Sequence, residues 1–149
     1  MKCKALLFLV SLLLITCDSS DSNSRTAITT FFEQFKTEGS DVAIDHLFAT
    51  NKWTKESKEQ IEITKANFKT ALKLLGDYHG YEELSIIKVS DNLKHFVYLA
   101  RFERQPLRLS FTLYRPFDKW QVQNFNYDYH ILEELKEASE LQKIVPTLN

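Results

Sequence analysis

Apolar side chains recur at helical spacing near the start of the chain. One face of a helix takes positions i, i+3, i+4 and i+7. The residues that follow this spacing are Ala27, Ile28, Phe31, Phe32 and Phe35. Ser24 and Thr26 are both suitable N-cap residues, and Gly39 is a typical C-terminal stop. The pattern therefore predicts a first helix from Ser24 or Thr26 to Gly39.

Two more helices are predicted before Gly76. A short one follows Ser40 or Asp41 and turns Ile44, Leu47 and Phe48 inward. A longer one begins at Ser57, where Gln60 completes a capping box, and ends at Gly76. Its inward residues are Ile61, Thr64, Phe68, Ala71, Leu72 and Leu75.

After Gly76 the hydrophobic period changes from 3.6 to 2, which is typical of strands. Four strands are predicted, at 81–89, 93–104, 107–115 and 120–127. A final helix is expected from Ile131 to about Ile144, before Pro146. Helices followed by consecutive antiparallel strands predict an α+β domain. Its N-terminal helices pack on a curved sheet of about four strands, with a C-terminal helix added.

The loop at Gln105-Pro106 predicts the register of the second hairpin. A two-residue loop sets three pairs on one face: Phe102 with Leu109, Ala100 with Phe111, and Tyr98 with Leu113. All six side chains are apolar or aromatic, so this face is expected to form the core. The opposite face is mixed in polarity, with Leu99 opposite Thr112.

The last strand leaves two interpretations open. Continuing the register across a four-residue turn puts Asn124 and Asn126 on the apolar face. Burying an amide without a hydrogen bond costs about 1–3 kcal/mol. In one interpretation the two amides line a ligand pocket with Tyr98 and Phe111. In the other, a bulge reverses the strand, so that both Asn face outward.

The first residues have the pattern of an export signal. Lys2 and Lys4 precede a run of apolar residues that is too short to span a membrane. The run ends in Leu14-Ile15-Thr16-Cys17, which resembles the lipobox of bacterial lipoproteins. This resemblance implies a signal peptide over residues 1–16 and a lipid on Cys17. It predicts a flexible tether over 17–24 and a single domain over 25–145. An ordinary secretory signal with an incidental Cys17 is the alternative.

Composition excludes several function classes. The 19 basic and 20 acidic residues give a net charge of −1, so no basic field favours nucleic acid. Cys3 lies in the predicted signal peptide and Cys17 is the only other cysteine, so the mature domain has no thiol for catalysis or zinc. No His pair has the spacing of metal ligands, and no cofactor is predicted. The aromatic share of 13% predicts a bulky core or an aromatic pocket.

The segment Tyr114–Val122, Tyr-Arg-Pro-Phe-Asp-Lys-Trp-Gln-Val, is followed by Phe125. It resembles the hairpin before the last strand in the nuclear-transport-factor-2-like superfamily, and the likeness covers roughly residues 25–129. The resemblance implies a cone-shaped sheet around a helix. Enzymes of that superfamily often hold an Asp/His pair inside the cone. Asp45 and His46 cannot form that pair with each other, because adjacent helix residues point about 100° apart.

Three functions follow as hypotheses. The leading one is a non-enzymatic domain on the extracytoplasmic side of the bacterial cell envelope, anchored to the lipid bilayer through Cys17. It would bind a small apolar ligand or a protein partner. The second is an isomerase or dehydratase with its active site inside the cone. The third is a homodimer that uses the mixed sheet face with Leu99, Thr112 and Tyr114.

Overall fold

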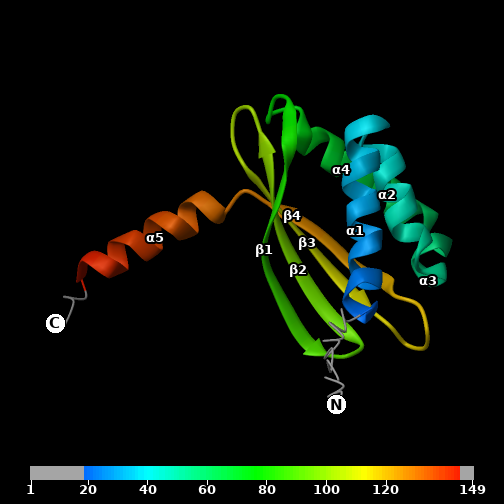
Figure 1. Cartoon of the computed structure of the whole chain (residues 1–149). Coiled ribbons are helices and arrows are strands. Elements are labelled where there is room, and N and C mark those ends of the chain that lie inside the picture. The colour runs from blue at the N-terminus through cyan, green and yellow to red at the C-terminus, as the bar shows by residue number, and fades with distance from the viewer. Residues whose placement is uncertain (1–18, 145–149) are drawn as a thin grey trace, which may run out of the picture.

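The computed structural model describes residues 19–144. In this range the elements are α1 (Ser19–Thr37), α2 (Ser40–Ala49), α3 (Lys52–Glu56), α4 (Lys58–Leu72), β1 (Tyr78–Ser90), β2 (Leu93–Phe102), β3 (Leu107–Tyr114), β4 (Gln121–Asp128) and α5 (Ile131–Ile144). Figure 1 shows α1, α2 and α4 together on one side of a curved sheet, while α5 extends away from it. The predicted α+β class and its layout are confirmed. The predicted signal peptide and Cys17 lie outside the described residues.

Helix α1 begins at Ser19, five residues before Ser24. Residues 19–24, expected to belong to a flexible tether, are therefore helical. The sheet explains the longer helix. Ser24 is fully buried, and Arg25 pairs with Glu83 of β1 and lies 5.8 Å from the ring centre of Phe96. Contacts that fix these two residues favour continuation of the helix through the polar residues before them, because adding one residue to an existing helix is far easier than starting one.

The starts of α2 and α4 and the bounds of α5 agree with the prediction, but α4 ends at Leu72, four residues before Gly76, and the short helix α3 was not predicted. Helix α2 begins at Ser40, and Gly39 before it has a φ of 98°. Ser57 precedes α4, but its side chain makes no capping hydrogen bond, so the capping box with Gln60 is wrong. The carbonyl of Ser57 instead accepts from the backbone N–H of Ile61.

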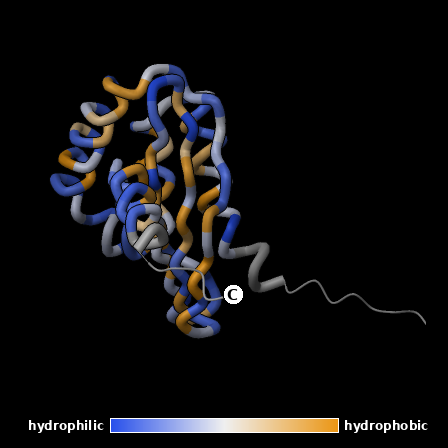
Figure 2. Tube along the Cα trace, turned by 90° about the vertical axis from the view of Figure 1, so that its left-hand side faces the viewer, coloured by the Kyte–Doolittle hydropathy of each residue, from blue (hydrophilic) through white to orange (hydrophobic). Residues whose placement is uncertain are grey.

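The four strands are antiparallel in the order β1-β2-β3-β4. Hydrophobic and hydrophilic positions alternate along β3, and the other strands carry both kinds in a less regular order (Figure 2). The predicted faces of β2 and β3 are correct, but their register differs: Phe111 lies opposite Phe96 instead of Ala100. The reason is the turn. The backbone N–H groups of Glu103 and Arg104 donate to carbonyls in the segment before β1, so residues 103–106 form a longer loop.

A bulge decides the orientation of β4. Leu113 lies opposite Val122, as predicted, and the register then shifts between Thr112 and Leu113. Phe125 consequently lies opposite Phe111 in the core, and Asn124 and Asn126 are exposed on the outer face. The pocket interpretation is therefore wrong and the bulge interpretation is correct. The shift buries an aromatic ring and leaves both amides in water, where they need no protein partner.

The core is a cluster of aromatic rings between the helices and the sheet. In the described part of the chain, every core residue falls between Ile28 and Phe125. Phe31 of α1 lies at its centre and is within ring contact of five others: Phe32, Phe35, Phe68, Phe111 and Phe125. Residues 19–149 contain this whole core, so we infer that they fold without the N-terminal segment.

The outer face of the sheet carries no helix over it in the described part of the chain (Figure 1). It displays the mixed side chains that the sequence assigned to it, with Leu99 and Thr112 partly buried and Tyr114 exposed. A homodimer through this face stays a prediction.

Arg108 links helix α5 to the sheet. Arg108 of β3 donates Nε to Asp128 at 2.9 Å and both of its terminal amino groups to Glu134 of α5, at 2.6 and 2.8 Å. This hydrogen bonding lowers the pKa of Glu134 from 4.5. A carboxyl group with a lowered pKa stabilises the docked position of α5 at every pH above the group's ordinary pKa. This stabilisation is lost as the pH falls through the lowered pKa.

We therefore expect α5 to loosen from the sheet in acid. The cysteine-free chain 19–149, spin-labelled at Asn124 and Ser139, should give a narrow distance distribution at pH 7. The distribution should broaden as the pH falls below 4.5. Arg108→Gln should broaden it at every pH. A narrow distribution in that variant would show that other contacts hold α5.

Candidate ligand-binding cleft

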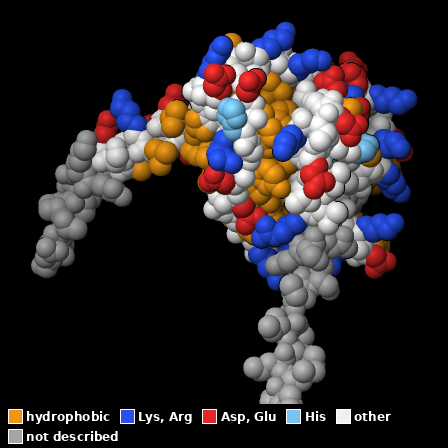
Figure 3. All heavy atoms as spheres, turned by 45° about the horizontal axis from the view of Figure 1, so that its top comes forward, with side chains coloured by type: hydrophobic (Ala, Val, Ile, Leu, Met, Phe, Trp, Pro, Cys, Tyr) orange, Lys and Arg blue, Asp and Glu red, His pale blue; other side chains and the backbone are white. Residues whose placement is uncertain are grey.

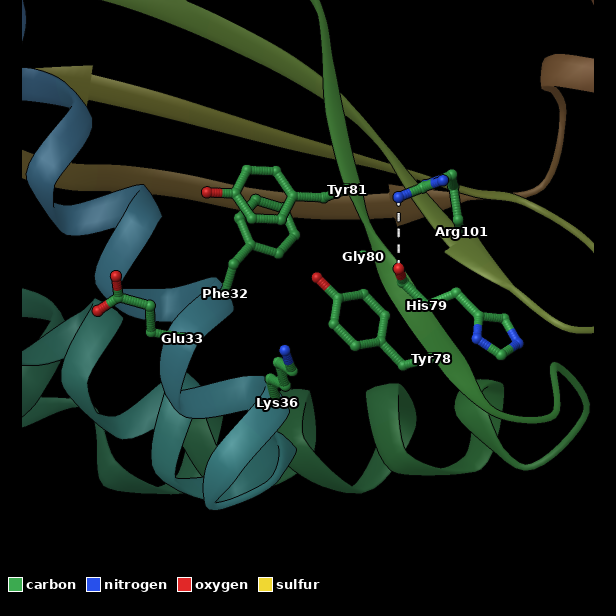
Figure 4. A pocket seen from close by; sticks show the side chains of 8 residues that line it. All are labelled: Phe32, Glu33, Lys36, Tyr78, His79, Gly80, Tyr81 and Arg101. Atoms are coloured by element: carbon green, nitrogen blue, oxygen red, sulfur yellow. Dashed lines mark hydrogen bonds between the residues drawn. The ribbon is translucent and has the colours of Figure 1, made fainter.

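An open cleft of about 520 Å³ lies between α1 and the β1 edge of the sheet. Figure 3 shows hydrophobic side chains gathered in a hollow on the face turned to the viewer, bordered by charged ones. Figure 4 shows the cleft from close by. Its lining residues are Phe32, Glu33 and Lys36 from α1, Tyr78, His79, Gly80 and Tyr81 from β1, and Arg101 from β2.

The walls are aromatic because two apolar patterns meet here. Phe32 belongs to the buried stripe of α1, and Tyr81 lies on the core face of β1 opposite Ala100. Their rings stack with centres 3.7 Å apart. Because β1 is an edge strand and no helix of the described chain lies beyond α1, Tyr78 and Tyr81 are only half-buried. Their remaining surface faces the cleft.

Gly80 allows Arg101 to lie close against β1. Gly80 has a φ of 125°, and a Cβ added there would lie 2.9 Å from Nη2 of Arg101. That nitrogen donates to the carbonyl oxygen of His79 at 3.3 Å, the dashed line in Figure 4. Nε of Arg101 lies 3.3 Å from Glu82. The rim arginine is therefore already paired with a carboxylate, while the His79 ring points away from the cleft.

Glu33, Lys36 and Tyr78 bring polar groups to the cleft. The polar ends of Lys36 and Tyr78 point toward the space beside the stacked rings in Figure 4, and the Glu33 carboxylate points away from Lys36. Lys36 makes no ion pair with any residue that the structure describes. Burial raises the pKa of Tyr78 to about 12. The hydroxyl is therefore protonated at neutral pH, where it can donate a hydrogen bond but cannot act as a base. The cleft can thus hold an apolar body on its rings and an anionic group at Lys36.

The predicted site residues do not share this cavity. Phe111 is fully buried, and Tyr98, 3% exposed, packs behind Phe32 with ring centres 5.4 Å apart. The Tyr98 hydroxyl donates to Glu83 at 3.0 Å, and burial raises its pKa. Asn124 and Asn126 lie on the opposite face of the sheet. Tyr98 and Phe111 therefore pack behind the wall of the cleft, whereas Asn124 and Asn126 lie on the other side of the sheet.

The cleft between α1 and β1 was not predicted from the sequence. The sequence feature that could have indicated the cleft is Tyr78-His79-Gly80-Tyr81. Here two tyrosines lie on either side of a glycine, where a turn was expected to lead into the first strand. That pattern does not reveal which sheet edge the helices leave uncovered.

Asp45 and His46 of α2 have separate partners. Asp45 lies 2.6 Å from Nζ of Lys65, and this hydrogen bond raises the pKa of the lysine. His46 is exposed and hydrogen-bonded to Gln34 of α1. Within residues 24–140, no carboxylate pairs with His46, so the Asp/His arrangement of the superfamily enzymes is not formed by these two residues. No cluster of ligating side chains that could hold a metal occurs in the described residues.

The described helices include none with the length and apolarity needed to cross a membrane. No protein-family model matches this chain, and comparison with curated proteins and with solved structures returned no significant match.

Proposed function

We propose that this chain is a non-enzymatic binding module, held on the extracytoplasmic surface of a bacterial membrane by a lipid on Cys17, that takes a small amphiphilic anion into the α1–β1 cleft. The observation that carries the proposal is the cleft itself. It sets the half-buried rings of Tyr78 and Tyr81 beside Lys36, which has no ion pair among the described residues. Pockets for small ligands commonly combine apolar walls with a few polar groups.

The ligand class follows from these groups. A flat or flexible apolar body covering the tyrosine rings would remove their exposed carbon from water. A carboxylate, sulfonate or phosphate at its end would accept a charge-assisted hydrogen bond from Lys36 and a second hydrogen bond from the Tyr78 hydroxyl. The raised pKa of Tyr78 favours this donor role, because a protonated phenol does not repel an anion.

The probe for the cleft is the dye anilinonaphthalene sulfonate, an aromatic anion of the proposed class. We expect its fluorescence to rise on binding and Lys36→Glu to weaken binding at least about tenfold, since a hydrogen bond to a charged group contributes about 1.5–3 kcal/mol. Lys73→Glu is the matched control. It makes the same charge change at an exposed lysine just beyond α4, outside the cleft, and should leave the affinity unchanged.

A second, uncharged dye tests whether Lys36 acts on the sulfonate or on the aromatic body of the ligand. N-phenylnaphthylamine has the same aromatic body without the sulfonate, so Lys36→Glu should leave its binding unchanged. If Lys36→Glu and Lys73→Glu weaken the binding of anilinonaphthalene sulfonate equally, the affinity depends only on the net charge of the protein. The cleft would then not be the binding site.

The anchor is tested separately by mass. Intact protein from its native membrane should have the mass of residues 17–149 plus acyl chains, and Cys17→Ser should lack that form. An unmodified mass for both proteins would remove the membrane part of the proposal and leave the dye experiment unaffected.

A further inference from the structure

Two exposed aromatic side chains line one depression at one end of the domain, away from the cleft. Trp53 of α3 is 65% exposed and Phe117 of the β3–β4 loop is 87% exposed. Both line a shallow depression of about 650 Å³ between α3 and that loop, together with two basic residues, Lys52 and Lys119, and one acidic residue, Asp118. We call Trp53, Phe117, Lys52 and Lys119 the Trp53–Phe117 surface.

The chemistry of this surface suits a lipid interface. Tryptophan is enriched where a membrane meets water, because its ring combines an apolar body with a polar N–H. Nζ of Lys52 lies 4.6 Å from the Trp53 ring centre, so a cation accompanies the indole at the surface. Neither Lys52 nor Lys119 makes an ion pair with a described residue. Lysines in this position attract anionic headgroups with about 1 kcal/mol each.

The chain leaves the domain at the same end. Figure 1 shows the first residues of α1 at the end of the molecule where α3 and the β3–β4 loop also lie. Cys17 is two residues before Ser19, where α1 begins. Two peptide steps span at most about 7.6 Å. A lipid on Cys17 would therefore hold this end, and not the opposite one, against the bilayer.

We propose that the Trp53–Phe117 surface docks on an anionic lipid bilayer. The two rings enter the interfacial region, and Lys52 and Lys119 contact anionic headgroups. The orientation that follows from Cys17 rests on the proposed function, but the affinity of the surface for lipid does not.

The experiment uses residues 19–149, which lack Cys17 and the apolar run, with vesicles of phosphatidylcholine alone or mixed with phosphatidylglycerol. We expect co-sedimentation with the mixed vesicles, and quenching of Trp53 by lipids brominated on their acyl chains. Trp53→Ser and Phe117→Ser should each lower the partition coefficient about tenfold or more, because burying a large apolar side chain contributes about 1.5–3 kcal/mol. The double variant K52E/K119E should bind the two kinds of vesicle equally weakly.

Leu74→Ser is the matched control. Leu74 is also 65% exposed. It lies next to Leu75, whose carbonyl accepts from Arg104 in the β2–β3 loop. In an antiparallel sheet that loop is at the other end from the β3–β4 loop, so Leu74→Ser should leave vesicle binding unchanged. Circular dichroism of each variant confirms that the fold is kept.

Two outcomes would overturn the proposal. One is that the wild-type chain 19–149 fails to sediment with either kind of vesicle. The other is that Leu74→Ser weakens binding as much as Trp53→Ser does. If either occurs while native protein carries acyl chains on Cys17, the anchor stands, and the Trp53–Phe117 surface faces something other than lipid.

Discussion

Phe31→Ala is expected to lower the free energy of unfolding by about 3–5 kcal/mol, the usual range for a large buried aromatic side chain. Phe31 has no exposed surface and lies between α1, α4 and the sheet. Its ring centre is 5.3–6.5 Å from those of five other phenylalanines. Alanine would remove all five ring contacts and leave a cavity that the surrounding rings cannot fill without leaving their rotamers.

Urea unfolding followed by circular dichroism measures this loss. Phe117→Ala is the control, because the same change at a side chain 87% exposed should alter stability by less than about 0.5 kcal/mol. A loss below about 1 kcal/mol for Phe31→Ala would be far under the range for a core phenylalanine, and the helix layer would then not pack on the sheet as described.

Asn51→Ala is the second large effect, expected at about 2–3 kcal/mol because it removes two hydrogen bonds and leaves a buried carbonyl unpaired. Asn51 is 3% exposed, and its Nδ2 donates to the carbonyl oxygen of Val122 in β4 at 3.0 Å. Its Oδ1 accepts from the backbone N–H of Trp53 at 3.1 Å and so caps α3. One side chain therefore joins the helix layer to the edge strand β4.

Two further substitutions separate these contributions. Asn51→Asp keeps an acceptor for the Trp53 N–H but lacks the donor to Val122, so the cap should survive while the link to β4 is lost. Asn124→Ala removes an exposed amide from the same strand and should leave the urea midpoint unchanged. Equal midpoints for Asn51→Ala and Asn124→Ala would contradict the assigned role of Asn51.

The sequence was sufficient for every described element except the five-residue helix α3, because the signals of the others are local. The period change at Gly76 separates helices from strands, and the stripe that includes Ile28 and Phe31 marks the buried face of α1. The faces of β2 and β3 were also predictable, since the side-chain period of 2 assigns every second residue to one face whatever the register is.

Register and helix length were not predictable, because distant contacts determine them. Glu103 and Arg104 use their N–H groups on the segment before β1, which the Gln105-Pro106 turn does not reveal. The bulge beside Leu113 and the start of α1 at Ser19 likewise depend on what lies against them in the fold.

The candidate sites likewise combine features that local sequence predicts with features that distant contacts determine. An aromatic core between helices and a four-stranded sheet was predictable from the sequence, because periodicity and residue type fix which faces are apolar. The open β1 edge beside Tyr78 and Tyr81, and the depression that Trp53 and Phe117 both line, became visible only in the folded domain. Strands are about 4.8 Å apart and helices about 10 Å wide. How helices of that width are placed over a sheet depends on the packing of the whole domain, and no local pattern encodes it.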